Sequence, residues 1–238
     1  MKNSDMHKEM LIQVALGLGQ DLLNEIVFVG GCTTALLVTD DFTREQVRHT
    51  DDVDLIAHLD GYASYIKFIS KLKSREFKER LDNDAPVCAM WLGDLRVDIV
   101  PDDETILGFS NRWYKDAVKT ADDYQLTDNI KIRLIKPVHF VATKLDAYLG
   151  RGNGDPMASH DIEDILNLFD GRPELLSELA LAPVELRFFI AEQITSLLNN
   201  HNFEYAVQSC AMGDSSREHL IFDKLEASCQ LGNSQVSN

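Results

Sequence analysis

The sequence has little cysteine and no long apolar run, and each shortage excludes a class of protein. Its four cysteines are scattered and never form a Cys-x-x-Cys pair, which argues against a zinc knuckle or a disulfide framework. No stretch approaches the roughly 20 apolar residues that a membrane helix needs. The first residues lack the apolar core of a signal peptide, so we expect a cytoplasmic protein.

Basic residues are also scarce. The 238 residues include 23 Lys and Arg against 39 Asp and Glu, which gives a formal net charge of −16. A surface of this charge repels nucleic acid over most of its area, so a nucleic-acid partner must meet a local basic site or be bridged by metal. The hydrophobic share of 45% and the charged share of 26% are ordinary for a folded chain of one or two domains.

The first half of the chain alternates helical and strand patterns. Apolar residues recur at helical spacing over residues 6–23, which predicts a helix. A short β-branched run then stops at Gly30-Gly31, as a buried strand does before a tight turn. The pair Gly93-Asp94 is a hairpin signal between two apolar runs. We expect strands over 25–29, 51–57, 87–92, 95–100 and 130–135, and further helices over 32–39 and 61–73.

The second half has a helical pattern. Pro137 suits the first turn of a helix, and Leu, Ile and Phe recur at helical spacing after it. Helices are expected over 137–149, 159–168, 173–180 and 184–199. The sequence therefore predicts an α+β fold with three parts: an α/β domain over 1–135 with a mixed, mainly antiparallel sheet flanked by helices, a helical domain over 136–207, and a polar, partly disordered tail over 208–238 with one short helix at 217–228.

Three acidic residues stand in otherwise apolar strands. Asp52 and Asp54 are two residues apart, so their carboxylates project to the same face of a strand. Adjacent carboxylates repel each other, and apolar neighbours leave little room for solvation, so a cation is the natural partner. Asp98 has the same need in its own strand. Mg²⁺ or Mn²⁺ takes carboxylate oxygens, and we predict that Asp52, Asp54 and Asp98 are its ligands.

A phosphate site is predicted beside these acids. The strand that ends in Gly30-Gly31 opens a helix, and backbone N–H groups at such a turn can approach an anion closely. The hydroxyls of Thr33 and Thr34 would be additional donors. A triphosphate held at the glycines, with metal ions at the carboxylates, is what nucleotidyl transfer requires.

In this order the motifs resemble those of the nucleotidyltransferase superfamily, which includes DNA polymerase β. The two glycines are followed by Thr-x-Asp-Val-Asp-Leu at 50–55 and then by the lone Asp98. Further on, Lys-x-x-Ala-x-x-x-Arg at 144–151 and His-Asp-Ile-Glu-Asp at 160–164 resemble the third and fourth motifs of the AbiEii-type toxins of bacterial toxin–antitoxin and phage-defence systems.

This resemblance, over residues 26–168, implies a reaction and a role for each matching side chain. The enzyme would move a nucleoside monophosphate group from a nucleoside triphosphate to an acceptor hydroxyl. Lys144 would neutralise phosphate charge, and Asp161 would be a base in the second domain. The first motif departs from many relatives, because Cys32 rather than Ser follows the glycines. The implied set is catalytic Asp52, Asp54, Asp98, Lys144 and Asp161, and nucleotide-binding Gly30, Gly31, Thr33, Thr34 and Arg151, with Asp98 also as base for the incoming hydroxyl.

Each feature alone also has a structural explanation. The diglycine could be a tight turn without a ligand, and the acidic run could be a strand edge protected by charge. Asp98 could pair with Arg96 or Arg133, and Asp161 could cap its helix. The occurrence of all these motifs in one order favours the metal site over three separate structural explanations.

The acceptor stays open at this point. An AbiEii-like toxin would act on tRNA, on other RNA or on protein, and would have an antitoxin protein as its partner. A second hypothesis is a small-molecule nucleotidyltransferase of the aminoglycoside-modifying kind. A third is a non-catalytic binding relative that keeps the fold. No membrane partner is expected.

Overall fold

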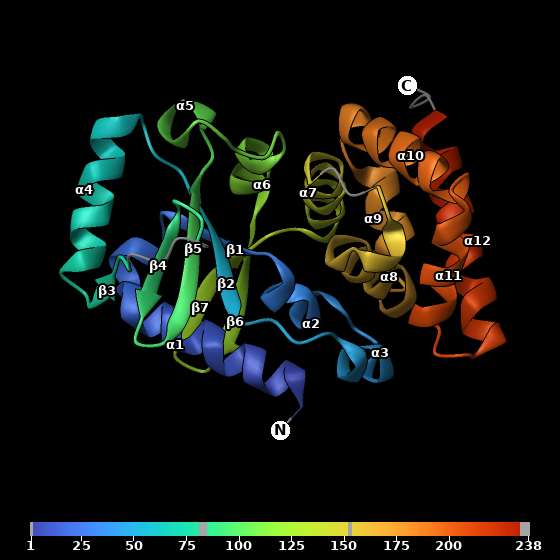
Figure 1. Cartoon of the computed structure of the whole chain (residues 1–238), viewed down its shortest axis with the longest axis horizontal. Helices are drawn as coiled ribbons and strands as arrows, with labels where there is room; N and C mark the ends of the chain where they lie inside the picture. Colours follow the sequence, from blue (N-terminus) through green and yellow to red (C-terminus); the bar gives the residue numbers. More distant parts are fainter. Residues whose placement is uncertain (1, 81–84, 152–153, 234–238) are drawn as a thin grey trace. The chain divides into compact units, whose positions relative to one another are not determined.

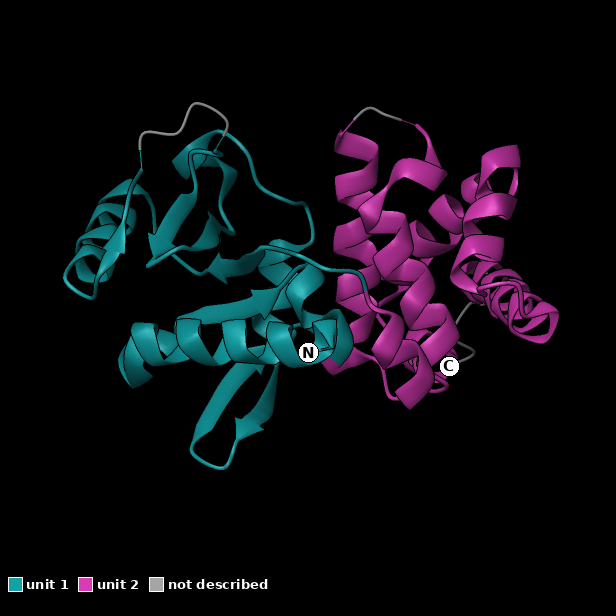
Figure 2. Ribbon diagram, turned by 60° about the horizontal axis from the view of Figure 1, so that its bottom comes forward, with its two compact units in different colours: residues 1–35, 48–136 teal, residues 36–47, 137–238 magenta. Residues whose placement is uncertain are grey.

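The computed structural model describes residues 2–80, 85–151 and 154–233 (Figure 1). It divides into two compact units, coloured separately in Figure 2. Unit 1 comprises residues 1–35 and 48–136, and unit 2 comprises residues 36–47 and 137–238. In the described part of the chain, no helix combines the length and the apolar character needed to cross a membrane.

The described residues of unit 1 contain a seven-stranded mixed sheet. Its strands are β1 (Ile26–Val29), β2 (Asp52–Ala57), β3 (Phe77–Lys78), β4 (Ala89–Leu92), β5 (Leu95–Pro101), β6 (Asp122–Thr127) and β7 (Ile130–Leu134). They lie in the order β3-β4-β5-β2-β1-β7-β6. β2 pairs with β5, and β1 with β7, in parallel, while the other neighbouring strands are antiparallel. The predicted α+β class with a mixed sheet is confirmed.

The centre of this sheet is the most apolar part of the chain. All four residues of β1 are buried, and so are the last three of β2. Strands buried on both faces read as continuous apolar runs in the sequence, which is why both were predictable. The neighbouring β4 and β5 form the predicted hairpin, with Leu92 opposite Leu95. Gly93 has a φ of 64°, which a two-residue hairpin turn requires.

Helices pack against the strands of the sheet. α1 (Asn3–Leu23) contacts β1, β2 and β7, and its buried side chains recur at helical spacing: Leu11, Val14, Ala15, Leu18 and Leu22. A 3-10 turn, η1 (Gly31–Thr33), follows β1 and continues into α2 (Thr34–Leu37). The remaining helices of unit 1 are α4 (Tyr62–Lys73), α5 (Glu104–Leu107) and α6 (Tyr114–Thr120).

Unit 2 is helical, and it includes a segment that the sequence placed in the first domain. Its helices are α3 (Asp41–Gln46), α7 (Pro137–Gly150), α8 (His160–Gly171), α9 (Leu175–Leu181), α10 (Val184–Leu198), α11 (His201–Cys210) and α12 (Ser215–Asn233), with a short 3-10 turn η2 (Pro156–Ala158). The structure corrects the expected 1–135 boundary at residues 36–47. There the Thr43 hydroxyl donates to Asp170 on α8 at 2.6 Å, and the N–H groups of Thr39 and Asp40 donate to the Gly171 carbonyl at 2.9 Å.

The structure also corrects the expected polar tail over 208–238. α12 spans Ser215–Asn233 and buries Ile221 and Leu225, which are four residues apart and so lie on one helix face. A Cβ on Gly232 would lie 2.4 Å from Cβ of Ala191, so α12 approaches α10 too closely there for any side chain. The helix is longer than the expected 217–228 because this narrow face is buried along it. Residues 234–238 lie outside the described residues.

Candidate metal centre

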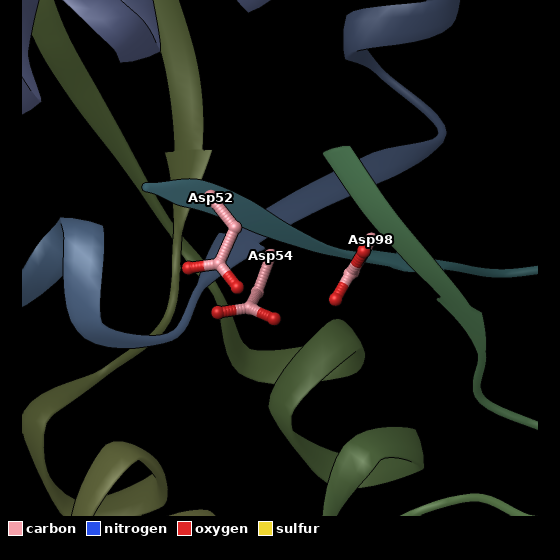
Figure 3. Close-up of side chains that lie close together, drawn as sticks. All are labelled: Asp52, Asp54 and Asp98. Carbon is pink, nitrogen blue, oxygen red and sulfur yellow. The ribbon is translucent and has the colours of Figure 1, made fainter. Parts of the chain in front are cut away.

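Three carboxylates from two neighbouring strands converge in unit 1 (Figure 3). β2 carries Asp52 and Asp54, and β5 carries Asp98, with Asp54 directly opposite Asp98 in the parallel register. Residues two apart on a strand share a face, so the register brings all three to the same side of the sheet. One oxygen of each lies within 4.8 Å of the others. We call Asp52, Asp54 and Asp98 the carboxylate triad.

The burial of Asp98 gives the triad its electrostatic character. Its side chain is 11% exposed. Burial raises the pKa of Asp98 to about 6 against the lowering effect of the Arg96 charge, and the charge of Asp52 contributes to the rise. Oδ1 of Asp98 is fully buried and receives no hydrogen bond from the described residues. A buried carboxylate oxygen without a hydrogen bond, beside two more carboxylates, fits the oxygen ligands of a hard divalent cation.

Arg96 lies against this triad and was named from the sequence only as an alternative partner of Asp98. Its guanidinium donates a hydrogen bond to Asp52, and its Nε lies 3.3 Å from Oδ1 of Asp98 without hydrogen-bond geometry. Arg133, the other alternative, instead donates to the Val118 carbonyl. The pairing of Asp98 with Arg96 is therefore present as an ion pair. It leaves the buried oxygen of Asp98 without a hydrogen bond.

The glycine turn after β1 is fitted to the triad. Gly30 has a φ of 75°, and a Cβ built on it would lie 1.8 Å from Oδ2 of Asp54. Glycine is therefore needed both for the backbone conformation and for the approach of the carboxylate. The hydroxyl of Thr33 donates to the Gly30 carbonyl at 2.8 Å, and Thr34 is fully buried. Gly31 begins the 3-10 turn, so the four predicted phosphate-binding residues form one turn beside the carboxylates.

The other groups around the triad favour oxygen ligands over sulfur. The Thr50 hydroxyl donates to Oδ1 of Asp52 at 2.5 Å and fixes that carboxylate. Burial, together with the nearby charges of Asp98 and Asp54, raises the pKa of the Cys88 thiol to about 12. Burial likewise raises the pKa of Cys32 well above its ordinary value. Thiols that stay protonated are poor metal ligands, so the donor set is one of carboxylates.

The remaining predicted residues form a second charged cluster, within unit 2. Lys144 on α7 is buried, and its Nζ lies 3.1 Å from Asp161 and 2.7 Å from Asp164 on α8. Arg151 lies 2.8 Å from the other oxygen of Asp161. The cap of α8 is Ser159, whose hydroxyl accepts from an N–H of the first turn. Asp161 thus pairs with two cations and does not cap its helix.

Sequence reasoning missed two contacts of Asp52, one with Thr50 and one with Arg96, which it had named only as a partner of Asp98. A signal existed for both. Thr50 and Asp52 are two residues apart, as are Arg96 and Asp98, and in a strand that spacing places side chains on one face. Asp52 also lies directly opposite Arg96 in the sheet, which required the parallel pairing of β2 with β5 to be known.

Comparison with known proteins gives no family for this chain. No protein-family model matches the sequence, and no curated protein matches it either. The chemistry of the site therefore has to follow from the geometry described above.

Proposed function

We propose that this protein is a metal-dependent nucleotidyltransferase, which moves a nucleoside monophosphate group from a nucleoside triphosphate to an acceptor hydroxyl. Its unit 1 would then have the nucleotidyltransferase fold of the DNA polymerase β superfamily, in the variant found in AbiEii-type toxins. The observation that carries the proposal is the convergence of three carboxylates, one with a buried oxygen that receives no hydrogen bond, beside a turn that only glycine can form.

The carboxylate triad and the glycine turn of unit 1 have separate roles in this proposal. The triad would hold Mg²⁺ or Mn²⁺, which when bound supplies positive charge to the triphosphate and lowers the pKa of the attacking hydroxyl. The turn at Gly30 and Gly31 offers the triphosphate a backbone without side chains in its path. Thr33 holds that turn through its bond to the Gly30 carbonyl. Asp98 would also be the base for the incoming hydroxyl, as the resemblance implies.

The cluster in unit 2 has a weaker claim to catalysis. Lys144 would neutralise phosphate charge and Asp161 would act as a base, as the resemblance implies. Both side chains are buried and paired with each other, and Asp161 is 1% exposed. Their contacts support a structural role in joining α7 to α8, and Arg151, whose side chain is 67% exposed, is the member best able to reach a ligand.

The test is a transfer assay with a matched pair of variants. Each of the four α-labelled nucleoside triphosphates is offered with Mg²⁺ to total RNA, to cell protein and to a panel of aminoglycosides. We expect transfer by the wild type into one of these acceptor classes, and its loss in Asp54→Asn. Asp51→Asn is the control, because its side chain is 90% exposed and lies one residue from the triad.

The outcomes separate the alternatives. Label in RNA or protein supports the toxin-like activity, and label in an aminoglycoside supports the small-molecule transferase. Equal transfer by wild type and Asp54→Asn would show that the triad is not the active site. No transfer, together with no binding of any triphosphate in Mg²⁺, would leave the non-catalytic binding relative.

A further inference from the structure

A cavity of about 820 Å³ lies in unit 1, away from the triad. It lies where β2 and β5 end, because His58 and Asp102, which directly follow these strands, are among its lining residues. The triad lies nearer the beginnings of the same strands. At about 3.3 Å per strand residue, the four residues from Asp54 to His58 span about 13 Å. The volume is in the range of sites for small molecules, roughly 300–1,000 Å³.

Basic side chains gather around this cavity although the chain as a whole is acidic. α4 contributes Lys67 and Lys71, and α6 contributes Lys115 and Lys119 (both helices are labelled in Figure 1). Residues four apart share one face of a helix, so each helix turns a pair of ammonium groups to the same side. Arg133 on β7 adds a fifth cation. Five of the 23 basic residues of this acidic chain therefore line one cavity.

Three of the four acidic residues of the lining are engaged in local contacts, and the fourth, Asp60, is exposed. Asp102 is buried, and its Oδ2 lies 2.8 Å from Nδ1 of His58. Asp103 caps α5 through its carboxylate, and Glu25 lies 3.8 Å from Nζ of Lys71. These contacts take up negative charge that would otherwise repel an anion.

Two of the four lysines that line the cavity have no acidic partner among the described residues. Within the part of the chain that the structure describes, Lys67 and Lys115 form no ion pair, and both are exposed. They come from different helices, one on α4 and one on α6. An anion between them would meet two cations that have no competing carboxylate within ion-pair distance.

The cavity also has an apolar part. Leu59, Phe68 and Val118 line it and are themselves buried, with Phe68 only 2% exposed. Inorganic phosphate alone would fill little of the 820 Å³, whereas an uncharged ring attached to the phosphate occupies more of the cavity and lies beside these apolar side chains. We propose that this cavity is a second ligand site, which binds a small phosphorylated molecule carrying several negative charges and an uncharged ring.

The proposal is independent of the metal centre, and a binding experiment without metal tests it. Calorimetric titrations are run in EDTA with two probes, inorganic tripolyphosphate and adenosine 5′-triphosphate. Without divalent cations the triad repels both probes, so binding reports the cavity. We expect both to bind at 50 mM NaCl, the adenosine compound at least threefold more tightly, and both at least tenfold more weakly at 300 mM NaCl because salt screens the lysines.

Matched variants locate the binding. The double variant Lys67→Ala with Lys115→Ala should bind both probes at least tenfold more weakly than the wild type. Lys8→Ala with Lys78→Ala removes the same charge from exposed positions outside the cavity and should change affinity less than twofold. Circular dichroism melts of both double variants check that each is folded.

Several results would overturn the proposal. One is no binding of either probe to the folded wild type. Another is equal weakening by the two double variants, which would mean a diffuse charge effect. A third is a change of more than twofold in probe affinity in the Asp54→Asn variant, which would place the probes at the triad. Equal affinity for the two probes would refute the ring portion of the ligand.

Discussion

The triad makes Asp98→Asn a stabilising substitution in the absence of metal. Burial raises the pKa of Asp98 from 3.8 to about 6. The folded chain therefore binds more protons than the unfolded chain between these values, so the free energy of unfolding falls as pH rises through this window. At about 1.4 kcal/mol for each pH unit, the charged carboxylate costs roughly 3 kcal/mol above pH 6. Asparagine carries no charge and avoids this cost.

Chemical denaturation in EDTA at pH 4 and at pH 8 measures the effect. Near pH 4 the folded wild type holds its proton, and the two proteins should have similar stability. At pH 8 the Asn variant should be more stable by up to roughly 3 kcal/mol. Asp51→Asn, at an exposed position where Asp51 pairs with the exposed His49, should change stability by less than about 1 kcal/mol at either pH.

Added Mg²⁺ should make the wild type more stable than the Asp98→Asn variant. A cation that binds only the folded wild type adds stability, about 2.7 kcal/mol at a concentration 100 times its Kd. Mg²⁺ at pH 8 should therefore raise the stability of the wild type and leave Asp98→Asn nearly unchanged. If Asp98→Asn were less stable than the wild type at pH 8 in EDTA, the carboxylate would serve mainly as a partner for Arg96, and the reasoning from burial would be refuted.

Three further substitutions test the surroundings of the triad and the cluster of unit 2. Gly30→Ala should displace the Asp54 carboxylate and reduce Mg²⁺-dependent transfer at least about 100-fold. Gly93 also has a positive φ, but a Cβ on it would meet no atom within 4 Å, so Gly93→Ala should cost about 1–2 kcal/mol of stability and keep activity. Arg96→Gln removes a cation that competes with Mg²⁺, so calorimetry should show roughly tenfold tighter Mg²⁺ binding, and unchanged affinity would contradict this. Lys144→Met removes the buried cation that Asp161 and Asp164 share and should cost about 3–5 kcal/mol in chemical denaturation. A wild-type midpoint would rule out a structural role.

Much of the sheet was predictable because its central strands obey local rules. β1 and β2 are short apolar runs, and the β4–β5 hairpin has a glycine turn. β6 was missed because its sequence, Asp-Asp-Tyr-Gln-Leu-Thr, is polar and only Leu126 is buried. It is a strand because it is paired with β7 at the end of the sheet, which no periodicity within the segment reveals.

The triad was predictable for a different reason. Charged side chains in apolar strands need partners, and this requirement named Asp52, Asp54 and Asp98 before any pairing was known. The requirement does not say which partner each one has. The contact of Arg96 with two of the three acids depends on β2 lying parallel to β5, strands that are separated in sequence by α4, β3 and β4.

The association of residues 36–47 with unit 2 could not be predicted from the sequence. α3 is six residues long, with only Thr43 buried, so it carries no apolar stripe that could have assigned it to a core. It is held by polar contacts instead: the Asp40 carboxylate caps it, and both Thr43 and Arg217 donate to Asp170. Such contacts are specific in the folded chain and have no signature in composition or periodicity.

The parallel pairing of β2 with β5 also decides how the two proposed sites influence each other. It puts carboxylates near the beginnings of both strands and a cavity rimmed by lysines at their ends, about 13 Å away by strand rise. That separation exceeds the Debye length of about 8 Å at 0.15 M salt but not the length of about 30 Å at 0.01 M. In EDTA, Asp98→Asn should therefore leave tripolyphosphate affinity within twofold at 0.15 M NaCl and tighten it measurably at 0.01 M. An equal effect at both salt concentrations would mean that the two sites are coupled through the strands and not through the field.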